Sequence, residues 1–342
     1  MQKGRCLVGG TRLVSSGHKS GLPTTRQSGA WAGTVRHETS PEFPQQGFAA
    51  PSASNGQAQT LPLLRKLFLP VAPFLRSPFF RVRTTSERYS KGLRLEAMRI
   101  SVELVPRSEA EVYADASLVH AAMPEVNAFN IPDLMRFPLR SWDACAIASK
   151  ILPASIPHIR AIDIPPVGDL PMAEAILASG LSEVLVIRGD PPRDLSQQTY
   201  PNTSDDIIRR FKRHHPKLKV FAAFDPYRQS FRDELDAVAR KVDAGADGFF
   251  TQPIFDLRLL EVCAEMLRGH NVFWGIAPVV GPRSRAYWET TNKIIFPSDF
   301  NPTLDWNRAF ARSAIKAIGK LDANVYLMPI RVNLAKYLNG LI

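Results

Sequence analysis

The chain has 342 residues, 22% of them charged, and a formal net charge of +11. Residues 1–97 contain 14 Lys and Arg against four acidic residues, whereas residues 98–342 contain 29 against 28. The excess of positive charge therefore lies in the N-terminal part. The nearly neutral remainder gives no reason to expect a nucleic acid or an anionic membrane as its partner.

Residues 1–97 are rich in Ser, Gly, Pro, Thr and Arg and lack sustained periodicity, so we predict a disordered basic extension. Two origins are compatible with this composition. A transit peptide would direct the protein to a mitochondrion or a plastid. An over-extended gene start would leave it cytoplasmic, and we favour this origin because Met98 directly precedes the first predicted strand.

Two further features bear on the class of protein. The apolar cluster at residues 61–80 is interrupted by basic residues and prolines, so it lacks the roughly 20 uninterrupted apolar residues of a membrane span. The spacing of the three cysteines matches no zinc or redox motif, which predicts a reducing compartment, no disulfide framework and no metal site. These cysteines are Cys6, Cys145 and Cys263.

From Met98 onward, apolar β-rich runs alternate with helical patterns. The predicted strands begin at residues 100, 126, 158, 183, 219, 246, 271 and 323. The predicted helices cover residues 110–123, 141–151, 170–179, 205–215, 232–244, 257–268 and 306–320. This alternation favours a single domain at 98–342 with the fold of a (β/α)8 TIM barrel, which typically uses about 250 residues. The rival is an open doubly wound sheet, but no GxGxxG follows the first strand.

Polar residues lie at or near the predicted strand ends, which a closed barrel would bring together at its active-site mouth. Glu103 stands inside an apolar strand, where a carboxylate is costly unless it is paired or used. A solvent-facing Glu on an alternating strand is the alternative, and for Gln252 the alternative is an ordinary loop residue. The set at the predicted mouth is Glu103, Asn127, His158, Arg188, Asp190 and Gln252.

Several segments from Met98 onward resemble the methylenetetrahydrofolate reductase family, which are flavoenzymes built on a (β/α)8 barrel. RGDPP at 188–192 is similar to the family's strand-4 signature. KVDAGAD at 241–247, followed by TQPIFD at 251–256, is similar to its strand-6 signature. SVELVP, PHIRAI and GIAPV resemble further family patterns, and together these segments are specific.

The resemblance implies reduction of methylenetetrahydrofolate to methyltetrahydrofolate in one-carbon metabolism, with NADH or NADPH as the hydride donor and folate as the small-molecule partner. Glu103 would be the general acid that assists opening of the imidazolidine ring. Asp190 would stabilise the positive charge of the resulting iminium, and Gln252 would hydrogen-bond the pterin edge. Tyr287 would stack near the rings, although Trp288 is equally placed and core packing of this pair is the alternative.

The resemblance also implies FAD as a cofactor. His158, Arg188, Gly189 and Lys241 match family positions that hold the flavin, and Asp190 would lie against it. Asn127, Phe224 and Glu234 stand where the family usually has Thr, Tyr and Asp, and Arg160 with Ala161 replaces the usual Thr-Cys. These departures leave two alternatives open: a flavin-independent reductase that uses NADH directly, and a non-catalytic folate-binding or partner subunit. A homo-oligomer is compatible with each.

The segment 126–144 departs most from the family pattern. Its Asp133, Arg136 and Arg140 are compatible with a substrate loop. They are also compatible with a solvated loop that ends in a helix cap, and we favour this second interpretation.

Overall fold

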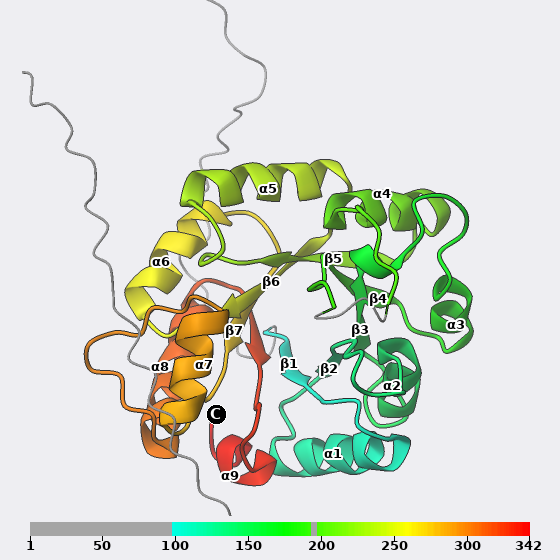
Figure 1. Ribbon diagram of the computed structural model, residues 1–342. Helices are drawn as coiled ribbons and strands as arrows, with labels where there is room; N and C mark the ends of the chain where they lie inside the picture. The colour runs from blue at the N-terminus through cyan, green and yellow to red at the C-terminus, as the bar shows by residue number, and fades with distance from the viewer. Residues whose placement is uncertain (1–97, 193–196) are drawn as a thin grey trace, which may run out of the picture. The chain divides into compact units, whose positions relative to one another are not determined.

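Eight parallel strands, each hydrogen-bonded to the next, close into a barrel in the computed structural model, which describes residues 98–192 and 197–342. β1 pairs with both β2 and β8, so the ring has no free edge. Figure 1 shows the helices around the outside of this ring, with α9 lying beside α1. The predicted (β/α)8 barrel is confirmed and the open doubly wound sheet is wrong. The predicted extension at 1–97 lies outside the described residues.

The elements follow one another in strict alternation until β7, which two helices follow. The strands are β1 (Ile100–Glu103), β2 (Ala128–Ile131), β3 (Ser155–Arg160), β4 (Glu183–Ile187), β5 (Lys219–Phe224), β6 (Gly248–Pro253), β7 (Val272–Ile276) and β8 (Asn324–Leu327). The helices of the described residues are α1 (Glu109–Ala122), α2 (Ser141–Ala148), α3 (Ala173–Ala178), α4 (Ser204–His214), α5 (Phe231–Asp243), α6 (Leu257–Met266), α7 (Pro282–Thr291), α8 (Leu304–Lys320) and α9 (Leu334–Leu338). A 3-10 turn, η2 (Ala161–Asp163), follows β3.

Local sequence explains where helices begin, and α4 is the clearest case. The Thr203 side chain accepts a hydrogen bond from the backbone N–H of Asp206, and the Asp206 carboxylate accepts one from the N–H of Thr203. This capping box satisfies two of the N–H groups that a helix start leaves unpaired. Ile207, Ile208 and Phe211 then lie on one buried face, so the helix is held against the barrel by its apolar stripe.

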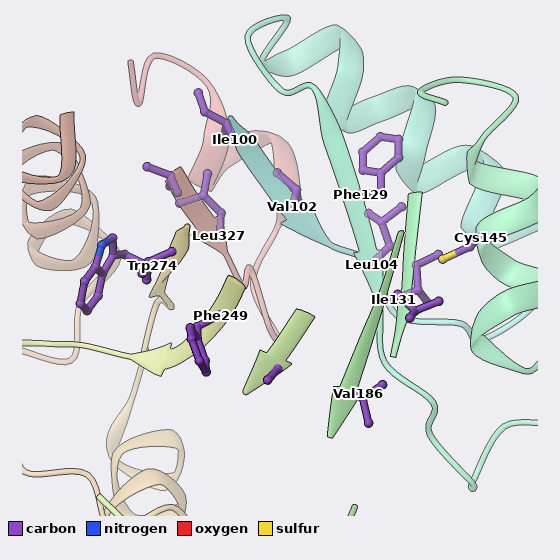
Figure 2. Close-up of a cluster of buried hydrophobic side chains, with 14 of the residues drawn as sticks. Ile100, Val102, Leu104, Phe129, Ile131, Cys145, Val186, Phe249, Trp274 and Leu327 are labelled. Carbon is purple, nitrogen blue, oxygen red and sulfur yellow. The ribbon is translucent and has the colours of Figure 1, made fainter. Parts of the chain in front are cut away.

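The barrel has an outer and an inner apolar core because successive strand side chains point to opposite faces. The outer core fills the space between strands and helices, and Figure 2 shows Ile131 of β2 next to Cys145 of α2 within it. Inside the barrel, the rings of Phe250 and Phe273 stack at 4.2 Å, and Phe221 packs edge-on against both at 5.3 and 5.6 Å. This aromatic layer closes the barrel interior below the strand ends.

Several boundaries differ from the sequence prediction, and two of them move candidate site residues. β3 begins at Ser155, three residues before the predicted start at His158, so His158 stands within the strand. β2 begins at Ala128, so Asn127 precedes its strand. α7 was absent from the predicted helices, because its segment carries a Gly-Pro start and few apolar residues. In the part of the chain that the structure describes, no helix is long and apolar enough to cross a membrane.

Candidate active site

A cavity of about 310 Å³ opens at the carboxyl ends of the strands, which is within the size range of small-molecule sites. Its walls come from the ends of six strands and from the loops that follow them. Six of the residues singled out from the sequence line it: Glu103, Arg136, His158, Gln252, Tyr287 and Trp288. Their chemical roles stay predictions, but the structure brings these six side chains to one place.

Glu103 is the last residue of β1 and is half-buried. The phenol Oη of Tyr326, on the neighbouring strand β8, donates a hydrogen bond to Glu103 Oε2. Burial raises the pKa of Glu103 from 4.5 to about 7, and the Tyr326 hydrogen bond opposes part of that rise. A carboxylic acid with this pKa holds its proton near neutral pH and can release it, as general acid catalysis requires.

A buried polar network lies beside Glu103 and includes residues that the sequence analysis did not single out. Ser101 Oγ donates to Asn130 Oδ1 at 2.8 Å, and Asn130 Nδ2 lies 3.0 Å from His158 Nε2. Burial lowers the pKa of His158 to about 3, so the ring is neutral and its Nε2 accepts the amide hydrogen. The signal for Asn130 in the sequence was an amide inside the otherwise apolar strand AFNI.

Gln252 lines the cavity two residues after Phe250, on the same face of β6. The register between β6 and β7 shifts between Phe250 and Pro253. Thr251 Oγ1 accepts a hydrogen bond from the N–H of Gly275 at 2.8 Å and donates one to the carbonyl of Gln252 at 2.9 Å. A Cβ at Gly275 would lie 2.6 Å from the Thr251 carbonyl oxygen, so the close approach of the strands requires glycine here. Within the described residues the Gln252 amide has no hydrogen-bond partner, and it is available to a ligand.

The helix α7 supplies an aromatic wall. Both Tyr287 and Trp288 line the cavity. Tyr287 is 44% exposed, whereas Trp288 is 6% exposed and packs against Phe255 at 6.2 Å between ring centroids. Core packing therefore describes Trp288, which also lines the cavity. Tyr287 instead presents its ring to the cavity opening. The guanidinium of Arg331 lies 5.6 Å from the centre of the Tyr287 ring.

The loop after β4 is placed differently from the prediction. Arg188 and Asp190 are exposed, and neither they nor Gly189 line the cavity. Arg160 Nη2 donates to the Asp190 carbonyl at 2.7 Å. Gly189 has φ of +86° and packs so closely on Arg160 that a Cβ would lie 3.1 Å from the arginine Cβ, which explains the glycine. The Asp190 carboxylate is thus on the rim of the barrel rather than on the wall of the cavity.

Asn127 and Phe224 are corrections to the predicted site. Asn127 lies before β2, at the opposite end of the barrel, where its Oδ1 accepts a hydrogen bond from the N–H of Ile100 at 3.0 Å. Its predicted position at the mouth is wrong because the first residue of β2 that pairs with β1 is Ala128. Phe224 is fully buried in the outer core, between the strands and the helices, so its ring faces away from the cavity.

Glu234 and Lys241 lie on α5 and bind each other rather than the cavity. Lys241 Nζ lies 3.7 Å from Glu234 Oε1 and donates to the Ala223 carbonyl at 2.7 Å. Glu234 also accepts from the N–H of Asp225 at 3.2 Å and from Gln229 Nε2 at 2.7 Å. The pair ties α5 to the end of β5, and the Lys241 charge, which the resemblance assigns to the flavin, is paired with Glu234 inside the protein.

Of the eight residues assigned to FAD by resemblance, His158 alone lines the cavity. The others are on the exposed β4 loop, in the outer core, in the α5 pair or at the opposite end of the barrel. A flavin needs donors for its ribityl chain and pyrophosphate that face one surface. The described residues do not fit the predicted FAD site.

The β2–α2 segment combines both interpretations that the sequence left open. Asp133 is buried, forms an ion pair with Arg140 and accepts a hydrogen bond from the N–H of Ser141, so its carboxylate caps α2. Ser141 Oγ donates to the His158 carbonyl at 2.7 Å, which ties the cap to β3. Arg136 instead lines the cavity. The helix cap is confirmed for Asp133, although this residue is buried rather than solvated, and Arg136 stays available at the mouth.

Comparison with known proteins gives one family and several distant structures. The family model described as Methylenetetrahydrofolate reductase matches residues 141–319. An uncharacterized protein from Clostridium thermocellum that binds two copies of 5-methyl-5,6,7,8-tetrahydrofolic acid is 12% identical, with a TM-score of 0.48 over 72% of this chain and 96% of that one. A 2,3-dimethylmalate lyase is 14% identical, with a TM-score of 0.45 over 70% of this chain and 78% of that one. At these identities and TM-scores, the two structures carry no functional argument.

Proposed function

The chain belongs to the methylenetetrahydrofolate reductase family, and from this premise we propose that it reduces 5,10-methylenetetrahydrofolate to 5-methyltetrahydrofolate with a hydride from NADH or NADPH. The observation that carries the proposal is Glu103, a carboxylic acid with a pKa of about 7 on the wall of the cavity. A reduction of this substrate needs one proton and one hydride, and Glu103 supplies the proton.

The Glu103 proton passes to the imidazolidine nitrogen as its bond to the methylene carbon breaks, which leaves an iminium on the substrate. Hydride from the dihydronicotinamide then adds to the methylene carbon to give the methyl group and the oxidised nicotinamide. The Glu103 carboxylate takes a new proton from water. Gln252 can hydrogen-bond the pterin edge, since its amide is unpaired among the described residues and faces the cavity.

The route of the hydride separates two forms of this function. FAD as an intermediate carrier is implied by the family, but of the residues assigned to it His158 alone lines the cavity. Direct transfer from the nicotinamide is favoured by the Lys241–Glu234 pair, which engages the cation that the flavin pyrophosphate would need. Tyr287 and Trp288 offer an aromatic wall against which a nicotinamide or pterin ring can stack.

The test is product formation by the purified full-length chain. Incubation under anaerobic conditions with methylenetetrahydrofolate and NADH or NADPH should yield methyltetrahydrofolate, identified by mass spectrometry. A colourless protein that turns over without added FAD supports direct transfer. Flavin absorption bands that bleach with the nicotinamide would instead support the flavin route, and folate binding without turnover would support a non-catalytic subunit.

Glu103→Gln keeps the size of the side chain and removes its acid. We expect the reductase rate to fall by about 100-fold or more, because general acid catalysis contributes at least that factor. Folate affinity should change little. Glu109→Gln, at an exposed position on α1, is the matched control and should keep the wild-type rate. An unchanged rate in Glu103→Gln would remove Glu103 from the mechanism.

A further inference from the structure

We propose that Tyr326 is a positioning residue for Glu103: its hydroxyl engages one carboxyl oxygen, Oε2, so that the acid carries its proton on Oε1 and presents it to the substrate. The inference rests on the proposed function, because it takes Glu103 as the acid. Tyr326 was not singled out by the sequence, and none of the roles implied by the family resemblance above includes it.

The phenol of Tyr326 has a fixed position next to β1. β8 is the strand next to β1, and Tyr326 is the register partner of Ser101, two residues before Glu103 on the same face of β1. The Tyr326 side chain is 4% exposed, and its ring packs edge-on against Phe250 at 5.3 Å. The packing of the ring therefore holds the hydroxyl against Glu103 Oε2.

The hydrogen bonds around Glu103 have defined donors and acceptors. Because Asn130 Oδ1 accepts from Ser101 Oγ, the Asn130 amide hydrogens must face its other partners. One of these is His158 Nε2. Beside this pair, the phenol Oη of Tyr326 is the donor and Glu103 Oε2 is the acceptor.

The Tyr326 hydrogen bond decides which carboxyl oxygen of Glu103 carries the proton. An oxygen that accepts a hydrogen bond from Tyr326 is not the oxygen that carries the proton, so the protonated acid has its hydrogen on Oε1. Within residues 98–192 and 197–342, Oε1 has no hydrogen-bond partner, and Glu103 lines the cavity. Once the proton has left, the same Tyr326 hydrogen bond stabilises the carboxylate. Tyr326 thus orients the donor and eases its release.

Other charged and titratable groups also face Glu103. Across the cavity these are His158 on β3, Tyr287 on α7, and the guanidinium groups of Arg136 and Arg331 on the loops after β2 and β8. On its other side Glu103 borders a second cavity of about 260 Å³, lined by Arg107 and Asp115, which lie 3.6 Å apart as an ion pair. His158 stays neutral well above its pKa of about 3, so it contributes no charge change near pH 7. Tyr326 is the described residue that hydrogen-bonds the Glu103 carboxyl directly.

The test replaces Tyr326 by Phe, which keeps the ring against Phe250 and removes the hydroxyl. Protein labelled with ¹³C at Glu carboxyl groups gives the titration of Glu103 by NMR, with the Glu103→Gln spectrum identifying its signal. We expect the Glu103 midpoint to rise by roughly one to two pH units, because a hydrogen bond to a charged group is lost from the carboxylate form. The falling limb of the rate against pH should move upward by the same amount, and the rate on the low-pH plateau should fall about tenfold.

Tyr337→Phe is the matched control. Tyr337 is also a fully buried tyrosine, but it lies in the outer core, and its Oη has no hydrogen-bond partner within the described residues. Its removal should leave the Glu103 titration and the pH profile unchanged. An unchanged Glu103 midpoint in folded Tyr326→Phe would overturn the proposal, even in a protein that turns over.

A second variant covers the case in which Tyr326→Phe does not fold. Site-specific 3,5-difluorotyrosine at position 326 keeps the hydroxyl and strengthens it as a donor, so the Glu103 midpoint should move downward. An unmoved midpoint would overturn the proposal. The titration needs no substrate, so it decides the Tyr326–Glu103 link whether or not the wild-type chain shows reductase turnover. A lack of turnover would instead count against the proposed function.

Discussion

The two ends of the barrel each contain a buried or half-buried glutamate, but the groups that contact the two carboxyls differ in charge. At the amino end, Glu183 of β4 is buried and binds Arg99 through both of its oxygens, at 3.0 and 2.7 Å, with Lys219 at 3.5 Å. The Arg99 guanidinium also lies 5.1 Å from the centre of the Phe273 ring. At the carboxyl end, Glu103 of β1 has no ion-pair partner in the described part of the chain and meets the hydroxyl of Tyr326 instead.

The difference lies in the groups that surround each carboxylate. A buried carboxylate is costly unless cations and donors surround it, and at the amino end they do. At the mouth, no cation among the described residues pairs with Glu103 to offset its desolvation, and this desolvation raises the pKa of Glu103. The aromatic layer of Phe221, Phe250 and Phe273 separates the two ends inside the barrel. Changes at one end should therefore have little effect at the other.

The largest expected effect on stability is at the amino end. Glu183→Ala leaves Arg99 without its partner beside Phe273, and we expect the free energy of unfolding to fall by about 4 kcal/mol. Urea unfolding followed by circular dichroism measures this loss. The folded fraction should keep the wild-type reductase rate, because the cavity is at the other end. A loss below about 1 kcal/mol, or a slower folded enzyme, would break the separation of the two ends.

The next effect is the pH dependence of stability at the mouth. The pKa of Glu103 is about 7 in the folded protein against an ordinary 4.5, so the folded state keeps a proton that the unfolded chain loses. This contribution to stability is full below pH 4.5 and is lost as the pH rises through 7, which amounts to about 3 kcal/mol. In Glu103→Gln that dependence should be absent.

Unfolding curves for wild type and Glu103→Gln at a series of pH values test this directly. The variant should gain stability relative to wild type between pH 4.5 and pH 7 and hold that gain above. Glu109→Gln, which changes an exposed acid on α1, should run parallel to wild type. Parallel curves for Glu103→Gln as well would mean that Glu103 ionises normally in the folded protein.

The smallest effect contrasts two neighbouring residues of β6. Gln252→Leu removes an amide that has no partner among the described residues, so it should leave stability unchanged and raise the KM for folate by about three- to tenfold. Thr251→Val removes one hydrogen bond between β6 and β7 and one within β6, and should lower stability by about 1–2 kcal/mol. Steady-state kinetics and urea unfolding of both variants give the comparison. A destabilised Gln252→Leu would show that Gln252 is structural.

The fold could be predicted from the sequence because apolar runs and helical patterns are each formed by residues close together in the chain. The positions of Glu103, His158 and Gln252 followed from the same rule, since strand ends meet at one face of a barrel. Asn127 was misplaced because the apolar run starts at Val126, whereas the pairing with β1 starts at Ala128. Strand register is decided by the neighbouring strand, which the segment VNAFNIP does not contain.

The sequence by itself determined the class of fold, the nearly neutral charge of residues 98–342 and the acid at the end of the first strand, because each follows from composition or from residues close together in the chain. Only the tertiary structure decided which polar groups meet. Tyr326 and Glu103 are 223 residues apart, and their hydrogen bond exists because the last strand closes against the first. Lys241 turned inward for the same reason: the strand it packs on offers the Ala223 carbonyl, and Glu234 lies within reach. Contacts of this kind are set by the closure of the ring and the packing of helices upon it.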